Sequence, residues 1–126
     1  MVSVRENRLC QVQKLCNQAA EHLHQQRYHR AIADYLLALE IVEEWGTPQM
    51  AAALLHCLGS IYRQLELYPR ALAFYRRTVI LLPESDNELR PVALQHIHEM
   101  AEKHHESQPR LLVTSWFGGE PLTVCC

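Results

Sequence analysis

The segment Ala53–Pro83, ALLHCLGSIYRQLELYPRALAFYRRTVILLP, decides the fold of this chain of 126 residues. Its apolar residues recur at steps of three and four, first over residues 55–65 and then over residues 71–82. That spacing gives each half one apolar helical face. Pro69 suits the first turn of a helix, and Pro83 ends one. The segment therefore predicts two antiparallel helices joined by a tight turn.

Small residues in this segment allow its two predicted helices to approach closely, because Gly59 has no side chain and Ala71 has only a methyl group. Four further residues complete a motif with them: Leu58, Tyr62, Tyr75 and Pro83. With this spacing the segment resembles a tetratricopeptide repeat, the helix-turn-helix unit of a family of superhelical binding scaffolds. It differs from the family pattern in Leu55, where tryptophan is usual, and in Thr78, where alanine is usual.

An internal repeat precedes this unit. Tyr28-x-x-Ala31-x-x-x-Tyr35 aligns with the same pattern at residues 68–75, so that residue 31 corresponds to residue 71. The first half of this earlier repeat matches the family less well, because Gln18, Ala19 and His22 stand where Leu58, Gly59 and Tyr62 stand in the later unit. The usual period of the family is about 34 residues. The period here is longer, as in the longer-repeat scaffolds of the family, so we place the extra residues in longer helix ends around residues 43–48.

Capping signals set the remaining helix ends. Ser3 and Glu6 have capping-box spacing, which predicts a helix from there to about residue 26. After a break near residues 27–29, a second helix should end at Gly46, and Thr47 is the predicted N-cap of the third. Ser85 and Glu88 repeat the capping-box spacing, but Pro91 suits a first turn, so a fifth helix is expected from about residue 90 to 105.

The sequence thus predicts an all-α fold, a tetratricopeptide-like α-solenoid of five helices over residues 1–106, with a non-helical C-terminal tail at residues 107–126. The tail contains a short apolar run at residues 111–117 before a Gly-Gly break. Two readings of it stay open: it folds back on the end of the helix stack, or it is a loose end. Whether the chain is a short form of a longer array also stays open.

The composition limits the classes of partner and the cellular compartments that we expect. A net charge of −2 and a pI near 6.4 leave no basic excess for a phosphate backbone, so nucleic acid is not an expected partner. The five cysteines form no CxxC pair, which indicates reduced thiols in the cytoplasm or the nucleus. No secretory signal or membrane span is visible. The terminal Cys125-Cys126 resembles the lipidated ends of Rab GTPases, but no C-a-a-X box is present, and nothing else resembles a GTPase.

The sequence contains no pattern typical of an enzyme or a cofactor site. The eight histidines include two pairs that lie two residues apart, 22/24 and 96/98, and such pairs point about 200° away from each other on a helix. Neither an HExxH motif, a glycine-rich phosphate loop nor a GxSxG elbow occurs. We therefore expect no catalysis, no cofactor and no metal site. An enzyme or a metal sensor that uses the histidines is retained as an alternative, which metal analysis of the chain purified without an affinity tag would test.

The resemblance implies a function in protein binding. In stacked repeats of this family the first helices of successive units line a concave groove. Carried over residue by residue, the groove positions are Gln13, Cys16, Ala20 and His24 in the first unit, and Ala53, His56, Ser60, Arg63 and Gln64 in the second. These small and mostly neutral polar side chains suit an extended peptide or a helix. The implied role is a scaffold or adaptor for a protein partner.

One well-known version of this groove is not expected. The family's carboxylate clamp, which holds the acidic C-termini of heat-shock chaperones, uses lysines, asparagines and an arginine. Here its positions hold Cys16, Ala20 and Cys57, so the sequence disfavours a chaperone-tail adaptor.

A structural role is the alternative. Two and a half repeats fall short of the roughly three that a solenoid needs. The open ends around Leu94, Ile97 and Trp116 could therefore pair with a second copy or complete a larger assembly.

Overall fold

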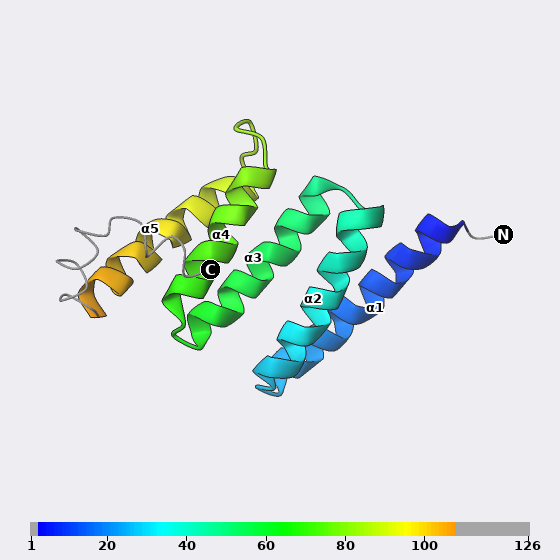
Figure 1. The fold of residues 1–126 in the computed structure, drawn as a ribbon, viewed down its shortest axis with the longest axis horizontal. Coiled ribbons are helices and arrows are strands. Elements are labelled where there is room, and N and C mark those ends of the chain that lie inside the picture. Colours follow the sequence, from blue (N-terminus) through cyan, green and yellow to red (C-terminus); the bar gives the residue numbers. More distant parts are fainter. Residues whose placement is uncertain (1–2, 108–126) are drawn as a thin grey trace.

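The computed structural model describes residues 3–107, with side chains as far as residue 102. It contains α1 (Val4–His24), α2 (Tyr28–Trp45), α3 (Pro48–Gln64), α4 (Tyr68–Leu81) and α5 (Leu89–Ser107). In Figure 1 these helices stand side by side in chain order. The closest packing is within the α1–α2 and α3–α4 hairpins, while α5 packs mainly on α4 and only briefly touches α3. The prediction of an all-α fold is confirmed, and residues 3–107 include no strand.

The predicted helix ends agree with the structure at three points. The Ser3 hydroxyl accepts a hydrogen bond from the backbone N–H of Glu6 at 3.1 Å, and the Thr47 hydroxyl accepts one from Met50 at 3.2 Å. Both side chains therefore act as N-caps. Gly46 follows the last residue of α2, as predicted. Because α2 continues to Trp45, most of the extra residues of the long repeat extend a helix.

The two hairpin turns have the same geometry at equivalent positions of the repeat. Gln26 and Glu66 both have φ of 61°. In the first turn the N–H of Arg27 donates to His22 O at 2.7 Å and that of Gln26 to Leu23 O at 3.0 Å. The equivalent bonds in the second turn run from residue 67 to 62 at 2.9 Å and from 66 to 63 at 3.0 Å. This is the Schellman arrangement, and it confirms the internal repeat in the backbone itself.

Close packing inside the second hairpin also agrees with the sequence. A Cβ atom added to Gly59 would lie 2.9 Å from Cδ1 of the Tyr75 ring, so no side chain fits there. Ala71 is fully buried. Nearby, the rings of Tyr62 and Phe74 are stacked with their centroids 5.3 Å apart. Gly59 and Ala71 thus allow α3 and α4 to pack closely, beside the stacked rings of Tyr62 and Phe74.

The connection from α4 to α5 is fixed by two charged side chains. Oδ1 of Asp86 accepts hydrogen bonds from three successive backbone N–H groups, those of residues 88, 89 and 90, at 2.9–3.1 Å. Arg90 donates through Nη1 to the carbonyl oxygens of Val79 and Leu82 at 3.2 and 3.3 Å. These bonds satisfy groups that helix ends leave free. The fifth helix starts at Leu89, one residue before the predicted start.

The predicted C-terminal tail falls almost wholly outside the described residues. The expected boundary at residue 107 lies within α5, which runs to Ser107. Both readings of the apolar run at residues 111–117 concern residues beyond that point.

Candidate functional site

The nine predicted groove residues divide into two groups by exposure. The exposed ones are Gln13, Ala20, His24, Ala53 and Gln64. The partly buried ones are Cys16, His56, Ser60 and Arg63. The partly buried members contact residues of other helices in the stack, and we take them as the centre of the candidate site. The exposed members lie at its border.

The groove positions on α1 and α3 form two separate strips. No Cα atom of α1 lies within 8 Å of a Cα atom of α3, although α2 packs on both helices. The backbones of α1 and α3 are therefore not packed directly against each other, and only side chains can connect the two strips. Gln13 instead donates to Asn17 on its own helix at 3.2 Å.

One small cluster does connect these helices. The thiol of Cys57 on α3 lies close to the hydroxyl of Tyr35 on α2, and the thiol of Cys16 on α1 is close enough to influence both groups. Burial, reinforced by these two thiols, raises the pKa of Tyr35 to about 12. Burial also raises the pKa of each thiol, so neither is an activated nucleophile. Since their Cα atoms are more than 8 Å apart, a disulfide between them would require the helices to move.

A larger polar cluster lies where α3, α4 and α5 meet. We call it the histidine cluster, and its members are His56, Ser60, Arg63, Tyr75, His96 and Glu99. Three of its rings form a triangle: the centroid of His56 is 5.4 Å from those of Tyr75 and His96, which are themselves 5.0 Å apart. The hydroxyls of Ser60 and Tyr75 are hydrogen-bonded at 3.2 Å.

The hydrogen bonds of the histidine cluster define the protonation state of His96. Nη1 of Arg63 lies 2.9 Å from Nδ1 of His96. A guanidinium can only donate, so Nδ1 must be the acceptor, and the ring is neutral with its proton on Nε2. Burial lowers the pKa of His96, and the charge of Arg63 lowers it further, while Glu99 opposes the shift.

His56 is neutral for a related reason. Burial lowers its pKa, with smaller contributions from His96 and Arg63. Its Nε2 atom is buried and has no hydrogen-bond partner. Protonation of both ring nitrogens would therefore place a charge in a partly buried site where Nε2 has no acceptor among the described residues.

Glu99 supplies the only carboxylate that borders these rings among the described residues. It lies 3.8 Å from both Nη1 of Arg63 and Nδ1 of His96, and it also accepts a hydrogen bond from Gln95 at 3.1 Å. Its side chain is 40% exposed, so water screens these interactions. The Gln95 bond is the main reason that the pKa of Glu99 is lowered.

Sequence reasoning identified half of this cluster. His56, Ser60 and Arg63 were predicted as groove residues. Tyr75 was named only as part of the repeat motif, and His96 and Glu99 were not assigned to the site. The signal for His96 is the repeat itself, because Cys16, His56 and His96 hold the equivalent position on α1, α3 and α5.

The geometry of the histidine cluster suits packing or binding rather than nucleophilic chemistry. Ser60 is hydrogen-bonded to Tyr75 and not to a histidine, so the serine hydroxyl has no base to activate it. Within the described residues, no three side chains of His, Cys, Asp or Glu are placed to hold a metal ion.

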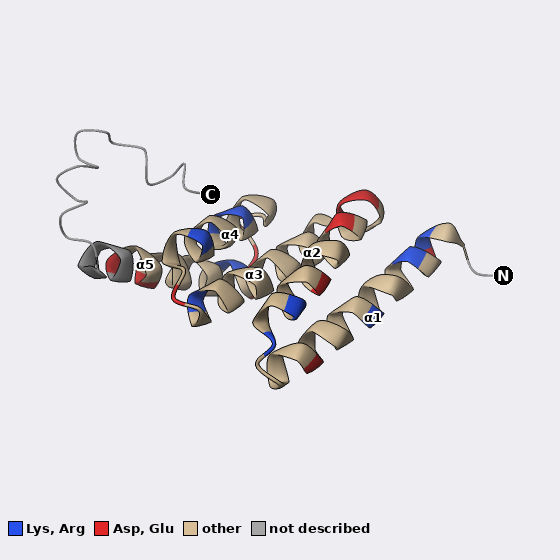
Figure 2. Ribbon diagram, turned by 60° about the horizontal axis from the view of Figure 1, so that its bottom comes forward, with Lys and Arg blue, Asp and Glu red and all other residues tan. Residues whose placement is uncertain are grey.

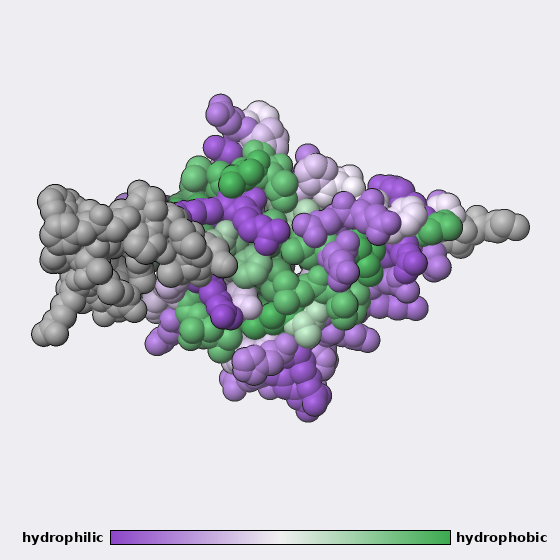
Figure 3. Space-filling model, viewed as in Figure 1, coloured by the Kyte–Doolittle hydropathy of each residue, from purple (hydrophilic) through white to green (hydrophobic). Residues whose placement is uncertain are grey.

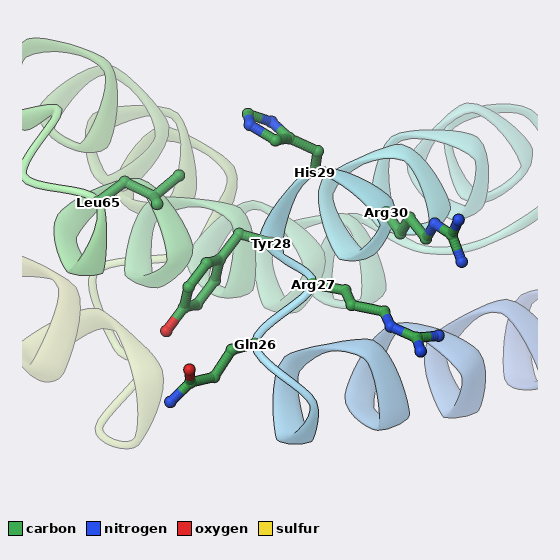
Figure 4. A pocket seen from close by; sticks show the side chains of 6 residues that line it. All are labelled: Gln26, Arg27, Tyr28, His29, Arg30 and Leu65. Atoms are coloured by element: carbon green, nitrogen blue, oxygen red, sulfur yellow. The ribbon is translucent and has the colours of Figure 1, made fainter.

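Two shallow cavities lie elsewhere on the surface. The first, of about 280 Å³, is at the α1–α2 turn and is lined by residues 26–30 and Leu65. Figure 4 shows Tyr28 and Gln26 pointing toward the α3 side of this cavity, whereas Arg27 and Arg30 point the opposite way. The polar groups therefore do not converge on one point. The second cavity, of about 340 Å³, lies between α1 and α2 and is lined by Gln11, Lys14, Leu15, Leu37, Glu40 and Ile41.

The remaining surface mixes apolar and charged groups. Figure 3 shows apolar surface over the middle of the face drawn in Figure 1, interrupted by polar side chains. Among the side chains that the structure describes, the most exposed large apolar one is Ile80 on α4, at 79%. Figure 2 shows basic residues on α4 but also acidic residues on neighbouring segments, so the described surface has no continuous basic stripe.

Comparisons with known proteins do not add a family. No family model matches the chain. No curated protein and no solved structure matches it either. Among the described helices, none combines the length and the apolar character that crossing a membrane requires.

Proposed function

We propose that the chain is a tetratricopeptide-like protein-interaction scaffold, which binds a peptide or a helix of a protein partner along the side formed by α1, α3 and α5. The observation that carries this proposal is the repetition of the helical hairpin, with the same turn and a positive-φ residue at the same position. Repeated hairpins that stack in one direction place equivalent helices along one surface, and such surfaces bind other chains.

The chemistry of this side supports a peptide or helix as the ligand. Ala20, Ala53 and Gln64 are exposed and offer small or neutral polar contacts. His56 and Arg63 already contact other residues of the histidine cluster. They therefore form the floor beneath a ligand, and Arg63 is not available as an unpaired charge. A ligand would therefore be recognised by shape and by hydrogen bonds to amide groups. An acidic chaperone C-terminus should not bind, because the only cation among the predicted groove residues of α3 is paired with Glu99.

Selection of peptides from a displayed library, followed by chemical-shift mapping on the full chain, tests this proposal. Selected peptides should perturb the backbone amides around Ala20, Ala53 and Gln64. The variant Ala53→Glu should weaken their binding at least tenfold, because a charge would be placed where a small neutral side chain meets the ligand.

A matched control uses Arg76→Glu, since Arg76 is exposed on α4, outside the proposed groove. It should leave binding unchanged. Ligands that map to α2 and α4 instead, or that bind Ala53→Glu as well as the unaltered chain, would overturn the proposal.

A further inference from the structure

The histidine cluster joins the last helix to the preceding hairpin through two neutral rings. His96 belongs to α5, whereas its contacts His56, Arg63 and Tyr75 belong to α3 and α4. Apart from the bonds of Arg90 at the start of the helix, α5 contributes apolar side chains to the interface, with Ala93 and Met100 fully buried. Because α5 touches α3 only briefly, His96 provides a large share of the specific contact between these two helices.

Protonation of His96 would reverse its strongest contact. Nδ1 would become a donor and would face the donor Nη1 of Arg63 across 2.9 Å. Two positive charges would then stand in direct contact, and their repulsion is strong in a partly buried site. The contact between Nη1 of Arg63 and Nδ1 of His96 is therefore lost on protonation, and this removes one of the bonds that hold α5 against α3.

Protonation of His56 would act in the same direction. Its buried Nε2 atom has no acceptor nearby, and its ring lies 5.4 Å from that of His96. A charge on His56 would be desolvated and would repel both Arg63 and a charged His96. Separation of α5 from α3 would give water access to both rings.

The other titratable groups around these rings do not cancel the destabilisation that protonation of His56 and His96 causes. On α4 the facing group is Tyr75, whose phenol stays neutral because burial raises its pKa. On α3 the facing charge is Arg63, and the partly buried thiol of Cys57 follows His56 in the chain. On α5 the carboxylate of Glu99 favours a charged His96, but it is exposed and lies at a distance of 3.8 Å. Burial and Arg63 together outweigh it.

We propose that His56 and His96 form an acid-sensitive latch, which holds α5 against α3 and α4 near neutral pH and releases it on acidification. The released state exposes the apolar side of α5 and the surface of α4 that it covered. The latch is argued from these contacts alone, so its test needs no ligand, although α5 and His56 also belong to the side on which the proposed groove lies.

The sign of the pH dependence follows from proton linkage. Both histidines have a lower pKa in the closed state than in the released state, where the pKa returns toward about 6.5. The released state therefore binds more protons below that pH. The contribution of the latch is complete above pH about 6.5 and is lost as the pH falls through the two lowered values.

Hydrogen exchange of the full chain, measured by mass spectrometry from pH 8 to 5 and corrected for intrinsic exchange, tests the latch. Below pH about 6.5, protection of α5 should fall by up to about tenfold per pH unit for each histidine that takes up a proton on opening. Protection of the α1–α2 hairpin should not change in parallel. Equal loss in all helices, or no loss in α5, would overturn the latch.

Variants assign the effect to the two rings. His56→Phe keeps a ring of similar size without a titratable nitrogen, and His96→Gln keeps a neutral acceptor near Arg63. The double variant should remove the pH dependence of α5, and each single variant should reduce its slope. His98→Gln is the matched control, because His98 is on the same helix and its side chain is 72% exposed. It should behave as the unaltered chain does.

If the double variant does not fold, the single variants and the NMR titration of the ring protons in the unaltered chain decide the question. Both rings should then titrate together with the opening of α5. Histidine rings that titrate while α5 stays protected, or a slope that His98→Gln removes, would refute the proposal.

Discussion

Two residues in left-handed backbone conformation close the two hairpins. Gln26 and Glu66 both have φ of 61°. This conformation is unfavourable for residues with a Cβ atom, whereas glycine adopts it freely and is the usual residue at this position of a Schellman turn. The repeat thus uses the same strained turn twice, and each turn can be improved separately.

Replacement of Glu66 by glycine should therefore stabilise the fold. We expect a gain of roughly 0.5–1 kcal/mol, which is the strain relieved minus the greater chain entropy of an unfolded glycine. For a chain of this size the melting temperature should rise by about 2–8 °C. Thermal unfolding followed by circular dichroism measures this. Glu66→Ala is the control, since alanine keeps the strain, and equal stability of the two variants would contradict the explanation. Gln26→Gly should repeat the result in the first hairpin.

At the scale of the helices, local patterns predicted the fold well. The periodicity of apolar residues and the caps Ser3 and Thr47 located the first four helices, because these signals act within one helical turn. The start of α5 was predicted to within one residue, but its capping residue was not predicted. Ser85 has capping-box spacing with Glu88, but the structure uses the carboxylate of Asp86, which reaches three N–H groups at once.

The candidate site was predicted only where the repeat pattern is strong. His56 and Arg63 follow from their positions in α3, whose motif is well matched. His96 and Glu99 lie on α5, where the motif is lost, and contacts between side chains on different helices depend on how the helices pack. Periodicity alone cannot supply that information.

The cap of α5 can be tested by substitution. Asp86→Ala should expose three backbone N–H groups, lower the melting temperature and increase hydrogen exchange in the first turn of α5. Ser85→Ala should have no effect, and Asp86→Asn should keep most of the cap because asparagine is also a good N-cap. Equal effects of Ser85→Ala and Asp86→Ala would contradict the assignment.

The pH dependence of this cap differs from that of the latch. The N–H of Arg90, followed by those of Glu88 and Leu89, lowers the pKa of Asp86 below its usual range. A lowered pKa means that the cap stabilises the fold above the unfolded value of about 3.9 and is lost as the pH falls through the folded value. The cap should therefore remain intact at the pH that opens the latch.

At the scale of the whole molecule, α3 lies between neighbouring helices and α1 lies at the edge of the stack, and their equivalent positions carry different side chains. On α3 a stripe of four apolar residues is buried: Ala51, Leu54, Leu58 and Ile61. At the equivalent positions of the first repeat, α1 carries Gln11, Lys14, Gln18 and Glu21, all of which are exposed. The described surface of α5 is comparable, because Gln95, His98 and Glu102 are exposed. Leu94, predicted to be part of an open apolar end, is exposed at 45% beside these polar groups, while Ile97 is partly buried.

These polar residues keep the outer side of α1 in water. Helix α3 packs on its neighbours through an apolar stripe, whereas the equivalent stripe of α1 would have to bury two charges in order to pair in the same way. Self-association through the outer side of α1 is therefore opposed by its own side chains.

Conversion of the α1 stripe to that of α3 should create an interface. The variant Gln11→Ala/Lys14→Leu/Gln18→Leu/Glu21→Ile places an apolar stripe on an exposed helix, and two copies can bury these stripes against each other with two-fold symmetry. Sedimentation equilibrium should show a concentration-dependent rise in mass, relative to the unaltered chain under the same conditions. The control Gln13→Leu/Ala20→Leu/His24→Leu adds apolar area to the neighbouring strip of α1 without reproducing the stripe. If both variants associate to the same extent, apolar area alone drives the pairing and the polar stripe is not what keeps this side of α1 free.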